Sequence, residues 1–287
     1  MLLLPVRSPL IHPGDDLAAI VSAAAREQHP PGMQRGDILV LSSKVLATAE
    51  GRIIHLASSQ PDEALAGEFI RRLSEACGKT PQFCEAVLQE LSRMHGRVLR
   101  TCPGAILTEV SPEGLREGTI LIANAGLDDS NAPLGHAIGW PEDAGKSVVR
   151  LRKELEQKME NGEWRMENDK QKKDKFSIFN SQLSIAVVVS DSCVHPRRSG
   201  VAAFALAVSG FDPVHSRVGS KDLFGRTMNI THEAVADQLA TAANMLMGNV
   251  AEQTPAVIVR DHGIPFTDFE GWVPGIRPRE DLFGKIV

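Results

Sequence analysis

Short runs of consecutive apolar residues alternate along the chain with segments whose apolar residues recur at helical spacing. The apolar runs predict buried strands at residues 36–43, 120–123, 184–190 and 256–260. The helical spacing predicts helices over residues 15–25, 64–77, 80–95 and 231–247, and Asp15 or Asp16 can cap the first. Residues 202–209 fit either type. The alternation of strands with helices predicts an α/β or mixed α+β fold.

The pattern changes over residues 150–180, where charges of both signs dominate. We interpret this stretch as a helix end followed by a solvated loop, and treat residues 156–180 as a charged, flexible insertion. A partner-binding arm is the alternative. Just before it, Gly145-Lys146-Ser147 resembles the end of a phosphate-binding loop, but Gly139 lies one residue too far upstream. A helix start is therefore predicted there.

Composition narrows the classes of function. The 287 residues are 43% hydrophobic and 23% charged, with a formal net charge of −5, which is typical of a globular chain of one or two domains. The acidic balance argues against a nucleic-acid or membrane-surface partner, and no apolar run approaches the roughly 18 residues of a membrane span. The four cysteines form no C-x-x-C pair, so a reduced, cytoplasmic protein is expected.

Two aspartates follow predicted strands: Asp128 comes after residues 120–123, and Asp191 after residues 184–190. Ligands bind beyond the carboxyl ends of strands in open α/β sheets, and paired carboxylates suit Mg²⁺ or Mn²⁺ during phosphoryl transfer. Asn124, Ser130 and Asn131 flank Asp128 and could reach phosphate or metal-bound water. The alternative is that each aspartate caps a helix or forms an Asx turn.

Basic side chains follow in two loops. Arg197 and Arg198 could bind carboxylate or phosphate, whereas Cys193 and His195 need not face each other on a loop and make a weak nucleophile–base pair. A second loop, residues 217–226, carries two arginines and a lysine and either binds an anionic substrate or is a solvated turn.

Eight short segments, in their order and spacing, resemble the coenzyme F420:L-glutamate ligase family, the CofE-like γ-glutamyl ligases. They are Ser-Pro-Leu-Ile-His-Pro-Gly-Asp-Asp-Leu from Ser8, Gly-Asp-Ile-Leu-Val-Leu-Ser-Ser-Lys from Gly36, Ala-Glu-Gly-Arg from Ala49, Ala-Asn-Ala-Gly-Leu-Asp-Asp-Ser-Asn from Ala123, Ser-Asp-Ser from Ser190, Asp-Leu-Phe-Gly-Arg from Asp222, Ala-Asp-Gln-Leu from Ala236 and Met-Gly-Asn from Met247.

The resemblance implies a single unit, residues 1–287, of two interleaved lobes with a CofE-like fold that forms a homodimer. It implies a ligase that consumes GTP, uses Mn²⁺ or Mg²⁺ (with K⁺ as a further candidate ion), and joins L-glutamate to F420-0 or a folate-like acceptor through an acyl phosphate. Phosphorylation of the acceptor makes chemical sense because a free carboxylate is a poor acyl donor.

The resemblance also assigns roles to residues. It implies metal ligands at Asp128, Asp191, Ser192 and Asn249, and catalytic roles for the two aspartates with Arg198 and Arg226. Nucleotide contacts are implied at Ser8, Pro9, Leu10, Ile11, Ser42, Ser43, Lys44, Asn131, Met247, Gly248, Asn249, Val250, Ala251, Glu252 and Gln253.

Three departures keep alternatives open. Asn249 stands where the family has an acid or Gln, and Thr48 where it often has Lys. In the loop that follows Ser-Asp-Ser, only Pro196 and Arg198 keep the family residues. The acceptor can therefore be a deazaflavin, a folate or pterin, or another carboxylate. A divergent nucleotide-binding protein without ligase activity is a further hypothesis.

Overall fold

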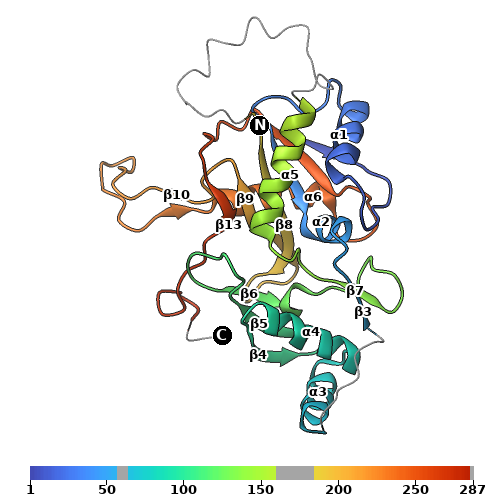
Figure 1. The fold of residues 1–287 in the computed structure, drawn as a ribbon. Helices are drawn as coiled ribbons and strands as arrows, with labels where there is room; N and C mark the ends of the chain where they lie inside the picture. Colours follow the sequence, from blue (N-terminus) through green and yellow to red (C-terminus); the bar gives the residue numbers. More distant parts are fainter. Residues whose placement is uncertain (57–63, 160–183, 285–287) are drawn as a thin grey trace, which may run out of the picture.

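The computed structural model describes residues 1–56, 64–159 and 184–284. Its centre is a six-stranded sheet in which β2 and β8 are parallel and all other neighbours are antiparallel (Figure 1). The order across this sheet is β1 (Leu2–Val6), β12 (Ala256–Arg260), β2 (Ile38–Ser42), β8 (Ala186–Val194), β9 (Val201–Ser209) and β13 (Glu270–Trp272).

Helices cover both faces of this sheet. One hydrophobic cluster packs Leu39 and Val187 against α1 (Leu17–Gln28) and α5 (Ala144–Lys158). The other packs Val40 and Val188 against α6 (Val235–Met247). Alternate residues of a strand point to opposite faces, so strands buried on both sides consist of apolar residues throughout. This explains the uninterrupted apolar runs in the sequence.

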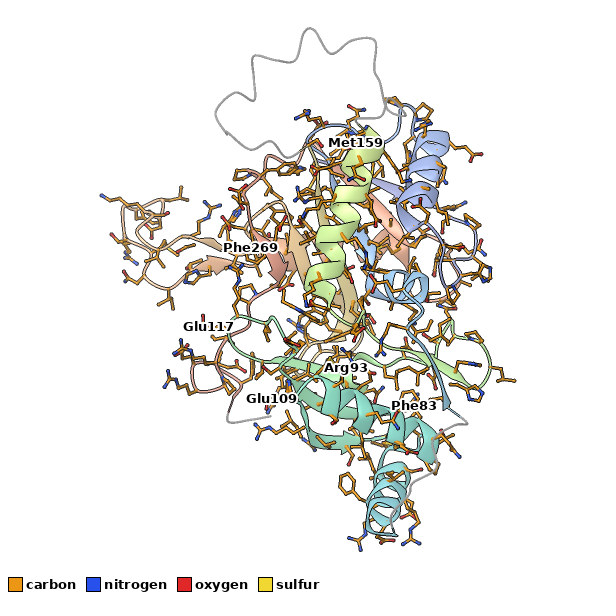
Figure 2. All side chains as sticks on the ribbon, viewed as in Figure 1. Phe83, Arg93, Glu109, Glu117, Met159 and Phe269 are labelled. Atoms are coloured by element: carbon orange, nitrogen blue, oxygen red, sulfur yellow. The ribbon has the colours of Figure 1, made fainter. Side chains whose placement is uncertain are left out.

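A second group of elements lies together at the lower end of Figure 1. They are the antiparallel strands β4 (Arg97–Cys102), β5 (Ala105–Val110) and β6 (Ile120–Ala123), the helices α3 (Ala64–Cys77) and α4 (Pro81–Arg93), and the short pair β3 (Ile53–His55) and β7 (His136–Ile138). Phe83 and Arg93 lie near the two ends of α4 (Figure 2): Phe83 is buried, and the half-buried Arg93 binds the buried Glu90. Phe83 belongs to the same hydrophobic cluster as α1 and α5, so one core runs through both regions.

Local sequence signals explain where the helices begin. Asp16 accepts the Ala19 amide at 2.8 Å at the start of α1, and Asp143 accepts the Lys146 amide at 3.1 Å at the start of α5. Thr80 caps α4, with Pro81 in the first turn. The helix start at Gly145-Lys146-Ser147 is thus confirmed, as is the mixed α+β fold class.

The structure corrects two boundaries and decides the type of one ambiguous segment. Residues 232–233 form β11 (His232–Glu233), which pairs with β10 (His215–Ser216), so the helix expected from residue 231 begins at Val235. The ambiguous residues 202–209 belong to strand β9. The strand expected to end at residue 190 continues to Val194 because it forms a hairpin with β9.

The start of the predicted charged insertion belongs to a helix. Residues 156–158 are the last residues of α5, and Glu156 binds both Arg152 and the Ser184 amide, the latter at 2.8 Å. The rest of the predicted insertion, residues 160–180, lies outside the described residues. Within the described residues, no helix combines the length and apolar character needed to cross a bilayer.

An ion pair joins the start of β2 to the end of β12. The buried Asp37, which precedes β2, accepts two hydrogen bonds from the guanidinium of Arg260 at 2.8 and 2.6 Å. It also accepts the Gln34 amide at 2.6 Å. Because these donors satisfy a carboxylate that water cannot reach, removal of the carboxylate leaves a half-buried arginine without its partner.

We therefore expect Asp37→Ala to lower the free energy of unfolding by about 3–5 kcal/mol in urea denaturation. Glu117→Ala is the matched control. It removes an exposed carboxylate 2.7 Å from Arg277 and should change the free energy by less than about 1 kcal/mol. Equal effects of the two substitutions would contradict this account of the Asp37–Arg260 ion pair.

Candidate functional site

The site begins where the parallel pairing of β2 with β8 ends. In the β2–β8 register Ser42 lies opposite Ser190, so the next residues of each chain segment emerge at the same edge of the sheet. After β2 the chain enters α2 (Ser43–Ala49), which carries Lys44 in its first turn. After Ser190 comes Asp191, directly beyond an irregularity in the pairing of β8 with β9. Such irregularities re-aim side chains at many active sites.

Asp128 reaches this edge by a different route from the one expected. Its preceding strand, β6, belongs to the separate three-stranded sheet, so the two aspartates do not follow strands of one sheet. A short 3-10 turn, η2 (Asn124–Gly126), redirects the chain with three successive positive φ angles. Asp128 then pairs through its backbone with Ile138, at 3.0 and 2.8 Å. Asp128 therefore reaches the end of β2 from a segment that is not part of the six-stranded sheet.

Lys44 joins the two regions. Its ammonium lies 2.7 Å from Asp128 Oδ2, 2.8 Å from the Ser130 carbonyl oxygen and 2.9 Å from Ser130 Oγ. The Ser130 amide and hydroxyl also donate to Asp128, at 2.8 and 2.7 Å. Asp128 thus forms the Asx turn considered as its alternative role, and it holds a lysine from the predicted nucleotide-binding segment as well.

Asp191 is held on both carboxylate oxygens. The indole nitrogen of Trp140 donates to Oδ2 at 2.6 Å, and the Ser192 amide donates to Oδ1 at 2.8 Å. Burial raises the pKa of Asp191 to about 6 despite these hydrogen bonds; Lys44 lowers it, whereas the charge of Asp128 raises it further. Burial therefore outweighs the nearby Lys44 charge and disfavours the ionised form of Asp191.

Asp128 differs from Asp191 in its electrostatics. Burial raises the pKa of Asp128, but the hydrogen bond and charge of Lys44, together with Ser130, outweigh burial and leave that pKa below its usual value. When both carboxyl groups are ionised, Lys44 balances only one of the two negative charges. The described residues contain no group of three or more His, Cys, Asp or Glu side chains placed to hold a metal. A cation here would depend on these two aspartates plus neutral oxygens.

The predicted nucleotide-binding segments also converge. The Ser8 amide donates to the Gln253 carbonyl at 3.1 Å, which joins the N-terminal segment to residues 247–253. The side-chain amide of Asn131 donates to the Val250 carbonyl at 2.6 Å, which joins the Asp128 loop to the same segment. These segments are far apart in the sequence, and the sheet edge is where they meet.

Other candidates take different positions. Asn124 accepts the Ile106 amide at 2.9 Å, so its side chain stabilises the η2 turn instead of facing a ligand. Arg198 lies in the exposed turn between β8 and β9. Arg226 lies in the loop that links β10 to β11, which extends away from the main sheet as an arm (Figure 1). Among the described residues, neither arginine nor Asn249 hydrogen-bonds to Asp128 or Asp191. Their roles stay predictions.

Cys193 is not an activated nucleophile. Burial, with the nearby charges of Asp237 and Asp191, raises the pKa of its thiol to about 11. Trp140, in contrast, was missed by the sequence analysis although it contacts Asp191 directly. No spacing signal links residues 140 and 191, because only the folded chain brings them together.

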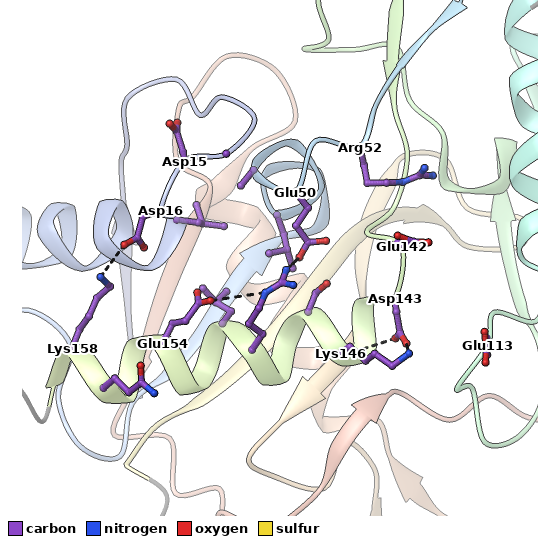
Figure 3. A pocket seen from close by; sticks show the side chains of 18 residues that line it. Asp15, Asp16, Glu50, Arg52, Glu113, Glu142, Asp143, Lys146, Glu154 and Lys158 are labelled. Carbon is purple, nitrogen blue, oxygen red and sulfur yellow. Dashed lines mark hydrogen bonds and ion pairs between the residues drawn. The ribbon is translucent and has the colours of Figure 1, made fainter.

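A cavity of about 980 Å³ lies apart from this cluster, between α5, the end of α2 and the start of α1 (Figure 3). It contains none of the predicted site residues. Seven carboxylates and four basic side chains line it, so it would repel a triphosphate. Its acidic residues are Asp15, Asp16, Glu50, Glu113, Glu142, Asp143 and Glu154. On this chemical ground the sheet edge, not the cavity, is the candidate nucleotide site.

Comparison with known proteins agrees with the resemblance. The family model described as F420-0:Gamma-glutamyl ligase matches residues 5–162 and 177–261. The chain is 33% identical over 261 residues to the coenzyme F420:L-glutamate ligase of Methanopyrus kandleri, which covers 91% of this chain and 86% of that protein. The protein of the same name from Methanothermobacter thermautotrophicus is 33% identical over 278 residues, 96% of this chain and 95% of that protein.

The relative of that name from Archaeoglobus fulgidus is 32% identical over 252 residues, 88% of this chain and 84% of its own length. Similarity therefore extends over nearly the whole chain and includes the segments that converge on Lys44 and the two aspartates. The chain belongs to the F420-0:γ-glutamyl ligase family.

Proposed function

We propose that this protein is a GTP-dependent, divalent-metal-assisted ligase that joins L-glutamate to the carboxylate of F420-0 through an acyl phosphate. The observation that carries the proposal is the convergence of three predicted nucleotide-binding segments on one lysine and two carboxylates. Family membership and the names of the relatives support glutamate as the amino acid and F420-0 as the acceptor.

The donor set fits Mn²⁺ or Mg²⁺. Both ions prefer carboxylate and other oxygen ligands, and each carboxylate oxygen of Asp191 accepts only one hydrogen bond here, which leaves a lone pair on each. Asp128 Oδ1 likewise accepts one hydrogen bond, from the Ser130 amide. Asp128 and Asp191 would hold the ion, whereas the predicted ligand Ser192 follows Asp191 within β8 and therefore presents its hydroxyl to the opposite face of the sheet. When bound, it would neutralise phosphate charge and orient the triphosphate for in-line transfer.

The chain's own residues then have defined tasks. Lys44 would bind phosphate oxygens, and the segments at residues 8–11 and 247–253 would hold the nucleotide. An oxygen of the acceptor carboxylate attacks the γ-phosphorus, the bond to the leaving GDP breaks, and an acyl phosphate forms. The glutamate amine next attacks the acyl carbon, an amide bond forms, inorganic phosphate leaves, and the amine releases its proton.

The test is phosphate release by the full chain with GTP, Mn²⁺ and L-glutamate, measured with each acceptor in turn. We expect release that requires both glutamate and F420-0. Release with a folate or pterin instead would identify that compound as the acceptor, which is the alternative that the altered loop at residues 193–198 suggests. No release with any acceptor would favour nucleotide binding without ligase activity.

In the same assay, Asp191→Asn should lower the rate about a thousandfold, because metal assistance supplies several kcal/mol of charge stabilisation. Asp129→Asn is the control: this neighbouring carboxylate is exposed and lies 3.3 Å from Lys79, away from the cluster. A rate close to the wild-type rate in Asp191→Asn would contradict the metal assignment.

The raised pKa of Asp191 predicts a pH dependence of stability. Between about pH 4 and 6 the native state retains a proton that the unfolded chain has lost, so the free energy of unfolding of the metal-free protein falls as pH rises through this window. The shift from 3.8 to about 6 limits this loss to about 3 kcal/mol, and partial exposure of the carboxylate reduces it.

Asp191→Asn should abolish this loss, so the metal-free variant should be more stable than the wild type above pH 6 and similar at pH 4. Urea denaturation with a chelator present measures the difference at each pH. Mn²⁺ at pH 7 should then stabilise the wild type and leave the variant unchanged, because only the wild type binds the ion. A stability difference that is the same at pH 4 and pH 7 would count against the electrostatic account.

We also propose a homodimer, in which the arm between β10 and β11 supplies Arg226 to a site shared with a second copy. Leu223 and Phe224 at the end of this arm are almost fully exposed, which is unusual for large apolar side chains and typical of a contact surface. Light scattering should give twice the chain mass, and Leu223→Asp with Phe224→Asp should give the mass of one chain. A single-chain mass for the wild type would exclude the shared site.

A further inference from the structure

Trp140 is the one side chain that donates a hydrogen bond to Asp191 within the described part of the chain. The indole is buried, at 1% exposure, and the 2.6 Å bond to Oδ2 is its polar contact. Buried indoles find a partner for their N–H group, and here that partner is a carboxylate of the proposed metal site. The bond restricts rotation of the carboxylate and leaves lone pairs of both oxygens available.

The ring itself is wedged in place. It lies so close to Gly126 that a Cβ atom there would come within 2.4 Å of the ring. Gly126 has a φ of +75°, a conformation that glycine adopts readily. The rings of Phe204 and Trp272 pack at centroid distances of 6.3 and 6.2 Å. The indole therefore has little room to turn away from Asp191.

The backbone that carries Trp140 is clamped as well. Arg52 donates to the Trp140 carbonyl at 3.2 Å, and Arg93 donates to the Glu142 carbonyl at 2.9 Å. Both arginines pair with Glu90, whose carboxylate is almost fully buried, at 2.5 and 2.7 Å. Glu90 and Arg93 belong to α4, and Arg52 directly precedes β3. Residues outside the main sheet therefore fix the backbone of Trp140, whose side chain binds Asp191.

We propose that Trp140 is a positioning residue that orients the Asp191 carboxylate for the divalent cation. The inference rests on the proposed function, because it assumes that Asp191 binds the metal. Hydrogen bonds to metal-binding side chains typically change metal affinity by tenfold or more when they are removed. Trp140→Phe removes the N–H donor and retains an aromatic ring.

Trp272 provides a matched control. It is also buried, it packs against Trp140, and its indole nitrogen donates to a carboxylate, Asp143 Oδ1, at 3.1 Å. Asp143 caps α5 and is not among the proposed metal ligands. Trp272→Phe therefore removes the same N–H group from a carboxylate outside the candidate metal site and retains an aromatic ring against Trp140.

The test measures Mn²⁺ binding to the full chain by electron paramagnetic resonance of the free ion, without nucleotide or acceptor. We expect Trp140→Phe to raise the Kd for Mn²⁺ about tenfold and Trp272→Phe to leave it unchanged, with similar losses in thermal stability for both variants. An unchanged Kd in Trp140→Phe, or equal increases in both variants, would overturn the inference.

Asp191→Asn separates this inference from the proposed function. If Asp191→Asn loses Mn²⁺ binding while Trp140→Phe retains wild-type binding, the positioning role fails and the metal site stands. If Asp191→Asn binds Mn²⁺ like the wild type, the metal assignment fails, and the inference fails with it.

A second measurement needs no Trp140 variant to fold. In the wild-type chain labelled with 5-fluorotryptophan, Mg²⁺ should shift the ¹⁹F resonance of Trp140 and leave that of Trp272 in place. Trp164→Phe and Trp272→Phe assign two of the three signals and leave that of Trp140 by elimination. A Trp140 resonance that does not respond while Mg²⁺ binds would overturn the proposal.

Discussion

The parallel pairing of β2 with β8 is the constraint on which the site depends. Every other neighbouring pair in the main sheet is antiparallel, so this is the one pair of neighbouring strands in that sheet that run toward the same end. That shared edge puts Lys44, in the first turn of α2, beside Asp191. Without it, the two residues would emerge at opposite edges of the sheet, and the charges of the candidate site would not meet.

The second carboxylate of the site, Asp128, follows a strand of another sheet, and local hydrogen bonds direct it to Lys44. The η2 turn redirects the chain after β6, the Asn124 side chain and Thr108 hydroxyl hold that turn, and Asp128 then binds Lys44. Gly126 gives room for the Trp140 ring, which reaches Asp191 from the same side. The η2 turn therefore affects both carboxylates: it leads the chain to Asp128, and its Gly126 leaves space for the Trp140 ring that binds Asp191.

The arrangement of charges in the candidate site is unfavourable when no cation is bound. Two carboxylates face one lysine, and burial disfavours the charge of Asp191, so the ionised Asp191 lowers the stability of the metal-free fold at neutral pH. Stability comes from elsewhere, from cores on both faces of the sheet and from paired charges such as Asp37 with Arg260. A site short of positive charge suits a ligand that brings a divalent cation with it.

The sequence by itself determined much of the local structure and the inventory of chemistry. Apolar runs and capping residues indicated the central strands and the starts of α1, α4 and α5, since these depend on neighbours in the chain. The ordered motifs indicated the family and the two aspartates. Only the tertiary structure decided that Asp128 comes from a second sheet, that β8 runs past Asp191, and that Trp140 binds it. The physical reason is that strand pairing and side-chain contacts across 51 to 149 positions depend on the packing of the whole chain, which no local pattern records.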